Sequence, residues 1–303
     1  MTQLLNGIAP LPHLGVIRVD GADAASFLQG QLTQDFVLLQ DNQARLAAYL
    51  SPKGRMLASF IGLRRSSTEL LLVCSRDLLP ATLKRLSMFV LRAQCKLSDA
   101  TGEFGLYGLA GSAAQQYLGA DAAPWSLKHE GQASVLALYP AAGNDRALWI
   151  APTGQRPEGQ ALGEDLWQWS EVQSGVATLS APVIDAFVPQ MLNYESLGGV
   201  NFKKGCYPGQ EIVARSQFRG TLKRRAYLAH APTPVAVGAE VFAQDDAEQP
   251  VGLVVQAAAA PGGGVDALVS LQIAATAGAL QVGAAQGVPL TLLPLPYALL
   301  TDV

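Results

Sequence analysis

The apolar residues of this chain form short runs separated by turn residues, a pattern typical of β-strands. Two such runs, 45–50 and 56–63, flank Ser51-Pro52-Lys53-Gly54, and this arrangement predicts a β-hairpin. Residues 77–90 differ, because their leucines recur at steps of three and four and predict an amphipathic helix. Hairpins interleaved with helices indicate an α+β fold rather than a doubly wound parallel sheet.

The pattern changes after residue 225, which indicates a domain boundary. Before it, residues 164–172 predict a helix that carries Trp167 and Trp169 toward different faces. After it, basic residues become very scarce and short apolar runs alternate with turns. We therefore predict two regions: residues 1–225, made of two interleaved α+β subdomains, and residues 226–303, a small antiparallel β-barrel.

Composition and charge narrow the class of protein. Half of the 303 residues are hydrophobic, and the net charge of −3 argues against bulk attraction to nucleic acid. The three cysteines show no metal-binding spacing, and their small number is typical of a reducing cytoplasm. The first twelve residues lack the pattern of a signal peptide, and no apolar run reaches about 18 residues. We expect a cytoplasmic protein without a metal site, a membrane span or strong direct binding of nucleic acid.

Candidate chemistry concentrates in residues 203–225. This stretch holds seven basic residues against one acid, Glu211, a local net charge of +6. Two glycines flank Cys206, and Pro208 predicts the first turn of a short helix. A thiol beside a helix N-terminus and near cations favours a thiolate or an anionic ligand. The competing interpretations are a solvated basic face and a cysteine that only fills space, the role we assign to Cys74 and Cys95.

The run Lys203–Gly220, KKGCYPGQEIVARSQFRG, resembles the signature of the YgfZ family. These are folate-binding proteins related to the aminomethyltransferase (T-protein) of the glycine cleavage system, and they are implicated in iron–sulfur enzyme maintenance and tRNA modification. Shorter matching runs lie at residues 30–35, 53–55, 181–185, 189–190 and 197–199. The resemblance covers roughly residues 14–225. It implies a T-protein-like multidomain ring of antiparallel sheets with helices, followed by a small C-terminal β-barrel.

The resemblance also implies a set of site residues. Cys206 and Lys204 are the candidates for catalysis. Trp167 matches a tryptophan that contacts folate in the family, and its flat indole can stack on a pterin ring. The other candidates for cofactor contact lie at family positions and are Gln173, Tyr207, Gln210, Glu211, Arg215 and Arg219. The implied cofactor is tetrahydrofolate or a one-carbon derivative of it.

The chain departs from the family pattern at three places. Leu14 stands where the family has a second folate-contacting tryptophan. Gln173 stands at about the position where related aminomethyltransferases have a glutamate, which would accept two hydrogen bonds from a pterin. Residues 56–59, MLAS, lack the acids that follow the hairpin turn in the aminomethyltransferase, so aminomethyl transfer has no obvious proton-handling group.

These observations lead to three hypotheses for function. The first is a tetrahydrofolate-binding protein in iron–sulfur cluster assembly or repair, with an indirect effect on tRNA modification, whose folate fills a central cavity with Cys206 at the rim. Its partners are a folate and iron–sulfur assembly or client proteins. The second is a folate-dependent aminomethyl or one-carbon transferase, so the sequence leaves enzymatic activity open. The third is a non-enzymatic module that docks a protein or RNA through residues 208–219.

Overall fold

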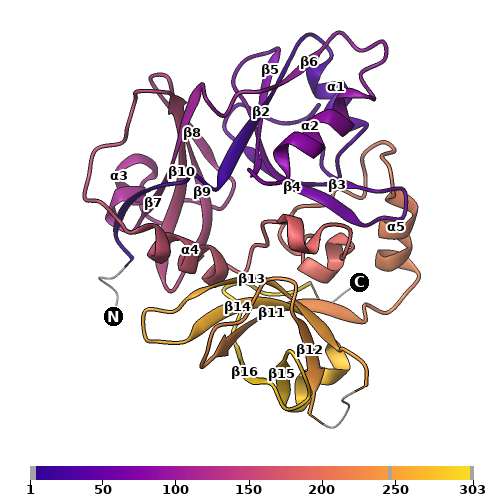
Figure 1. Cartoon of the computed structure of the whole chain (residues 1–303). Coiled ribbons are helices and arrows are strands. Elements are labelled where there is room, and N and C mark those ends of the chain that lie inside the picture. The colour runs from indigo at the N-terminus through magenta and orange to yellow at the C-terminus, as the bar shows by residue number, and fades with distance from the viewer. Residues whose placement is uncertain (1–4, 245–247, 301–303) are drawn as a thin grey trace.

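The computed structural model describes residues 5–244 and 248–300, and it is built from two antiparallel sheets and a closed barrel (Figure 1). The first sheet has five strands in the order β1 (Gly7–Pro10), β7 (Phe104–Ala110), β10 (Asn144–Pro152), β9 (Ala133–Ala141) and β8 (Leu127–Glu130). Helix α3 (Ser112–Leu118) packs against this sheet. Because β1 comes first in the chain and β7 follows the whole second sheet, the two sheets are interleaved in sequence.

The second sheet carries the hairpin that the sequence predicted. Its order is β3 (Ala44–Leu50), β4 (Met56–Arg64), β5 (Glu69–Ser75), β2 (Leu14–Asp20) and β6 (Lys96–Asp99). Strands β3 and β4 pair from Ala44 opposite Leu63 to Leu50 opposite Met56. Two helices, α1 (Ala24–Gln29) and α2 (Leu79–Ser87), pack against this sheet. The predicted amphipathic helix is therefore confirmed, although it is shorter than residues 77–90.

The C-terminal part of the chain, from Arg224 on, forms a closed barrel of six strands. Their order is β11 (Arg224–Ala231), β14 (Val265–Gln272), β13 (Gly252–Ala259), β12 (Glu240–Ala243), β15 (Leu280–Val282) and β16 (Val288–Leu293). The short helix η3 (Ile273–Ala277) follows β14. Alternating small and branched apolar side chains fill the interior.

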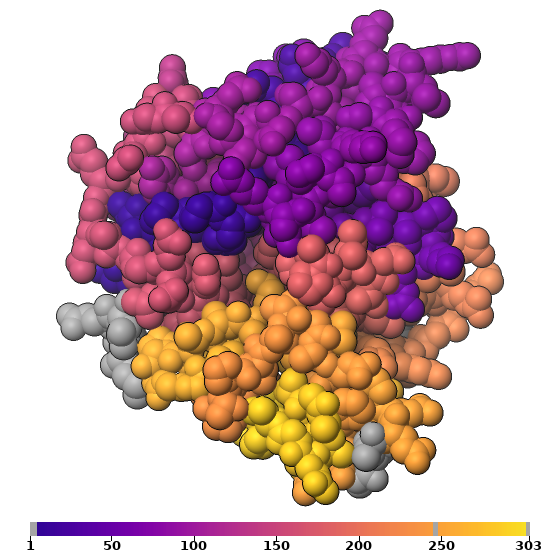
Figure 2. All heavy atoms as spheres, viewed as in Figure 1, coloured from indigo at the N-terminus to yellow at the C-terminus, as the bar shows by residue number. Residues whose placement is uncertain are grey.

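Helix α4 (Glu164–Gln173) and residues 174–207 join the three parts. This connection contains the short helices η1 (Ala181–Val183) and η2 (Pro189–Leu192), and α5 (Gln210–Phe218) follows it. Figure 1 shows the two sheets above, the barrel below and the connection between them, and in Figure 2 the three parts pack into one body. One hydrophobic core lies between the sheets, and a second includes residues of β3, the connection and the barrel. The predicted ring of antiparallel sheets with a C-terminal barrel is confirmed.

Candidate functional site

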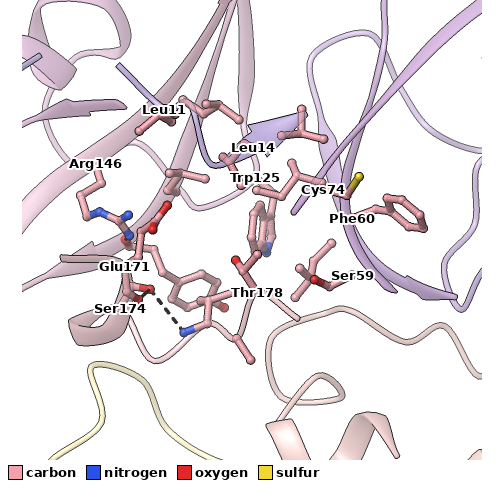
Figure 3. A pocket seen from close by; sticks show the side chains of 18 of the residues that line it. Leu11, Leu14, Ser59, Phe60, Cys74, Trp125, Arg146, Glu171, Ser174 and Thr178 are labelled. Atoms are coloured by element: carbon pink, nitrogen blue, oxygen red, sulfur yellow. Dashed lines mark hydrogen bonds between the residues drawn. The ribbon is translucent and has the colours of Figure 1, made fainter. Parts of the chain in front are cut away.

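A central cavity lies where the two sheets meet α4 and residues 174–178 (Figure 3). Its volume is about 60 Å³. Both sheets contribute to its lining, with apolar side chains such as Leu14, Ile61 and Leu148, and polar groups reach it from Ser59 and Thr178. A mostly apolar cavity with a few convergent polar groups between structural units is the usual form of a small-molecule site.

Helix α4 supplies Trp167 and Glu171 to this cavity. The two residues are four positions apart, so they share one face of the helix. Trp167 is 1% exposed, and its indole N–H donates a 2.9 Å hydrogen bond to Glu171 Oε1. The indole also lies against the backbone of Gly108, where a Cβ atom would come within 2.4 Å of the ring. The ring is therefore held in one position by its neighbours.

Arg146 places a buried cation beside this pair. Its guanidinium lies 4.4 Å from the centre of the Trp167 ring, and Figure 3 shows it on the same side of the cavity as Glu171. Burial lowers the pKa of Arg146 to about 10, and the charge of Glu171 opposes that shift. Among the described residues, Arg146 Nε has no hydrogen-bond partner. A buried unpaired donor is costly, so a ligand carbonyl or anion would stabilise it.

Glu171 is also the partner of His13, at the edge of the same site. Glu171 Oε1 lies 3.1 Å from His13 Nε2. Burial by itself lowers the pKa of His13, but the hydrogen bond and charge of Glu171 outweigh it, with help from Glu164, and the net pKa is raised. The stability that this pair contributes is present at acidic pH and is lost as pH rises through the raised pKa.

A second tryptophan, Trp125, also lines the cavity. It comes from the loop before β8 and donates a 3.1 Å hydrogen bond from its indole to the Leu197 carbonyl. Its φ is +69°, a left-handed conformation that is rare for a bulky residue. Such strained residues gather at ligand sites. The family has a second tryptophan where this chain has Leu14, but two tryptophans, Trp125 and Trp167, nevertheless line the cavity.

Gln173 does not line the cavity. It lies on the opposite face of α4, where its amide donates a 2.8 Å hydrogen bond to Asp266 of the barrel. Related aminomethyltransferases have a glutamate at about position 173, where this chain has a glutamine. The cavity instead contains the carboxylate of Glu171, two residues earlier. Helix geometry explains the difference, because residue 171 shares the face of Trp167 whereas residue 173 does not.

The Cys206 loop lies on a different part of the molecule. Cys206 is exposed, and no residue between 203 and 219 lines the central cavity. Helix α5 begins at Gln210, so Pro208 lies outside the helix rather than in its first turn. Gly209 precedes the helix in a left-handed conformation with φ of +78°. The structure thus separates the predicted thiol from the predicted folate site.

Lys204 is buried beneath this loop. Its ammonium donates to the carbonyls of Gln29 and Leu32, the latter at 2.9 Å, and lies 4.3 Å from the centre of the Tyr207 ring. Burial lowers the pKa of Lys204 to about 8, and the charge of Asp35 opposes the shift. The two carbonyls accept hydrogen bonds from the ammonium and so stabilise its charged form. Its contacts hold the loop against the end of α1, a structural role.

The other predicted contacts on this loop also lie away from the cavity. Tyr207 is buried, and burial raises its pKa to about 12. Gln210 and Glu211 open α5, with Glu211 exposed. Arg215 and Arg219 are exposed, and neither makes a side-chain hydrogen bond or ion pair within the described ranges. Both belong to the helix that follows the Cys206 loop, Arg215 in its last turn and Arg219 at its C-terminal cap.

Sequence analysis did not identify three residues that line the cavity, Glu171, Arg146 and Trp125. For the first two, the sequence does contain a pattern that indicates their position. Glu171 stands four residues after Trp167 on a predicted helix, a spacing that puts both on one face. Arg146 is the only charged residue within the apolar run 146–151, which is unusual for a buried strand. Trp125 gave no such signal, because only the tertiary fold brings its loop to the cavity.

Comparison with known proteins gives the chain its family. No protein-family model matches it. The tRNA-modifying protein YgfZ of Edwardsiella ictaluri is 34% identical over 227 residues, covering 70% of this chain and 67% of that protein. The YgfZ of Hamiltonella defensa is 32% identical over 239 residues, covering 74% and 70%. The chain belongs to the YgfZ family. An uncharacterized protein of Haemophilus influenzae is also similar, with 31% identity over 240 residues and coverage of 78% and 79%.

The fold of this YgfZ-family chain is shared with a known enzyme. The crystal structure of the glycine cleavage system aminomethyltransferase T from Bartonella henselae superposes with a TM-score of 0.71, covering 97% of this chain and 86% of that one. Sequence identity is 16%, so this likeness establishes the fold alone. No helix in the described part of the chain has the length and hydropathy of a membrane span.

Proposed function

We propose that this protein binds a reduced folate in the central cavity. The observation that carries the proposal is the set of groups around Trp167: a carboxylate, Glu171, and a buried guanidinium, Arg146, with an unpaired N–H. A pterin has amino and ring N–H groups for the carboxylate and a carbonyl for the guanidinium. The indoles of Trp167 and Trp125 offer flat apolar surface for its rings. The chemistry of the site therefore fits a folate.

The volume of the cavity sets a condition on this proposal. At about 60 Å³ it is well below the roughly 150 Å³ of an engineered protein cavity that admits benzene. A pterin is larger than benzene, so its entry requires the two sheets and the segment 174–178 to move apart. Because the cavity lies at the junction of separate structural units, small shifts of these units can widen it without unfolding either sheet.

Titration with 5-formyltetrahydrofolate, followed by calorimetry and tryptophan fluorescence, tests the proposal. We expect saturable binding that quenches fluorescence. Glu171→Gln is expected to weaken binding by about tenfold, because it removes a charge-assisted hydrogen bond. Glu164→Gln is the matched control, since Glu164 is an exposed acid at the start of the same helix. Absence of binding at millimolar folate, or equal weakening by both variants, would contradict the proposal.

We further propose that the protein acts in iron–sulfur cluster assembly or repair, and that tRNA modification responds indirectly. The similarity to this chain covers two thirds or more of the length of two relatives, and both carry the name tRNA-modifying protein. Cys206 is exposed, and α5, which follows its loop, carries the exposed Arg215, with Phe218, which is 70% exposed, and the exposed Arg219 at its C-terminal end. Such a surface suits an acidic partner protein that approaches the thiol. Within the described residues no cluster of three metal ligands exists, so the thiol would act transiently with groups from partners.

Cys206→Ser tests the role of the thiol. We expect folate binding to remain, because Cys206 does not line the cavity, and the rescue of iron–sulfur enzyme activity in a deletion strain to fall about tenfold or more, because a hydroxyl is a poor metal ligand and redox group. Cys95→Ser is the control, since Cys95 is a partly buried cysteine directly before β6. Full rescue by Cys206→Ser would remove the thiol from the function.

The cavity does not favour the transferase alternative. Strand β4 contributes Ser59, Phe60 and Ile61 to the lining, and none is an acid. Glu171 is the one carboxylate among the described residues that line the cavity, and it already accepts hydrogen bonds from Trp167 and His13. The other titratable groups of this lining include Cys74 and Tyr139, whose pKa values burial raises, so neither is a ready proton acceptor.

A further inference from the structure

A second hollow lies at the opposite face of α4, between this helix and the barrel. Its volume is about 520 Å³, and it shares no lining residue with the central cavity. The walls come from Trp169 of α4, from Asn144 at the start of β10 and from the Ala260–Gly263 turn that joins β13 to β14. Figure 1 shows β13 and β14 beneath α4. The volume falls within the range of about 300–1,000 Å³ that is typical of small-molecule sites.

A histidine backed by a carboxylate lines this hollow. His230 of β11 and Asp266 of β14 stand directly opposite each other in the barrel, and His230 Nδ1 lies 2.8 Å from Asp266 Oδ1. Asp266 Oδ2 accepts hydrogen bonds from Trp169 Nε1 at 2.7 Å and Gln173 Nε2 at 2.8 Å. The side chain of Asp266 is only 8% exposed, whereas that of His230 is 38% exposed. Asp266 is thus fully engaged, and His230 is the member of the pair that a ligand can reach.

The hydrogen bond to Asp266 sets what His230 offers to a ligand. Because the carboxylate accepts from Nδ1–H, the neutral imidazole has its lone pair on Nε2. Gly264 keeps that edge of the ring free of side chains, since a Cβ there would lie 3.1 Å from Nε2 and 2.9 Å from Cε1. Nε2 is therefore a positioned acceptor for an O–H or N–H donor.

The remaining lining describes the ligand. The indole of Trp169 and the apolar Leu5 and Pro261 suit a ring. Asn144 donates its amide N–H to the Ala142 carbonyl, which leaves its oxygen as a second acceptor. Among the described residues that line the hollow there is no lysine or arginine, so none of them would neutralise a phosphate. We propose that this hollow binds a neutral, ring-bearing molecule rich in O–H and N–H donors, a nucleoside being the class with these features, and that Nε2 of His230 accepts a hydrogen bond from it. The site is independent of the folate site and of Cys206.

The test uses the four common ribonucleosides as probes against the full-length protein. Binding is followed through the indole N–H signal of Trp169, which is assigned by its loss in Trp169→Phe. His230→Asn keeps a donor for Asp266, because the asparagine amide occupies the place of Nδ1, and it removes only Nε2. His129→Asn is the matched control, since His129 is exposed and bonds Ser134 on the first sheet.

We expect at least one nucleoside to shift the Trp169 signal saturably at millimolar concentration in the wild type and in His129→Asn. His230→Asn is expected to bind it about tenfold more weakly, the effect of one lost hydrogen bond. The proposal is overturned if none of the four nucleosides shifts the signal, or if His230→Asn binds as the wild type does. Tighter binding of the 5′-monophosphate than of its nucleoside would contradict a neutral ligand.

Discussion

Glu195→Ala is expected to lower the free energy of unfolding by about 3–5 kcal/mol, since it leaves a buried cation without its partner. Glu195 has a fully buried side chain and forms an ion pair with Arg225, whose side chain is 8% exposed. Arg225 also donates to the Leu300 carbonyl at 3.0 Å. This pair therefore joins the connecting segment, the first barrel strand and the C-terminal tail. Breaking it affects the packing of the barrel against the rest of the chain.

Two comparisons make this result specific. Glu130→Ala removes an exposed pair with Lys128, in which both side chains are more than half exposed, and such pairs contribute about 0–1 kcal/mol. The double variant Glu195→Leu with Arg225→Met is expected to recover much of the loss, because it leaves no buried charge unpaired. Urea denaturation followed by circular dichroism measures all three. A loss below about 1 kcal/mol for Glu195→Ala would mean that water reaches Arg225.

Much of the fold could be predicted from the sequence, because the turn residues and the spacing of apolar residues that determine its hairpins and helices lie close together in the chain. The turn Ser51–Gly54 between two apolar runs predicted the β3–β4 hairpin, and leucine spacing predicted α2. The scarcity of basic residues after Arg225 marked the barrel, whose first strand begins at Arg224. Boundaries were less accurate, since helix ends depend on contacts with other elements. The start of α5 is one example.

The candidate site could be predicted only in part. Trp167 was expected at a folate site, and it does line the central cavity. The other groups of that cavity come from β10 and the loop before β8, and no short-range pattern links Arg146 or Trp125 to α4. Sequence analysis also placed Cys206 at the rim of the expected folate cavity, on the strength of the family resemblance. Residues that share one family resemblance can belong to separate sites, and here Cys206 does not line the central cavity.

Two of the runs that carry the family resemblance, residues 53–55 and 203–220, are in close contact in the structure. The turn Ser51–Arg55 meets the start of α5 at a pair of glycines, Gly54 and Gly209. A Cβ on Gly209 would lie 2.6 Å from the Ser51 carbonyl oxygen and 2.8 Å from the Cα of Gly54. Both glycines also have positive φ values, +71° and +78°. Two backbones approach so closely here that neither position has room for a side chain.

Gly209→Ala is therefore expected to lower the free energy of unfolding by about 2–6 kcal/mol, through left-handed strain and a clash with backbone that cannot rotate away. Gly205→Ala is the matched control four residues earlier in the same loop. A Cβ at Gly205 meets nothing within 4 Å, and its φ is not positive, so we expect a change of less than about 0.5 kcal/mol. Urea denaturation measures both changes. Because the contact between the two glycines positions the Cys206 loop, the rate at which an alkylating reagent modifies Cys206 should change in Gly209→Ala. In Gly205→Ala this rate should stay as in the wild type. Equal stability of the two variants would show that this contact does not hold the Cys206 loop in place.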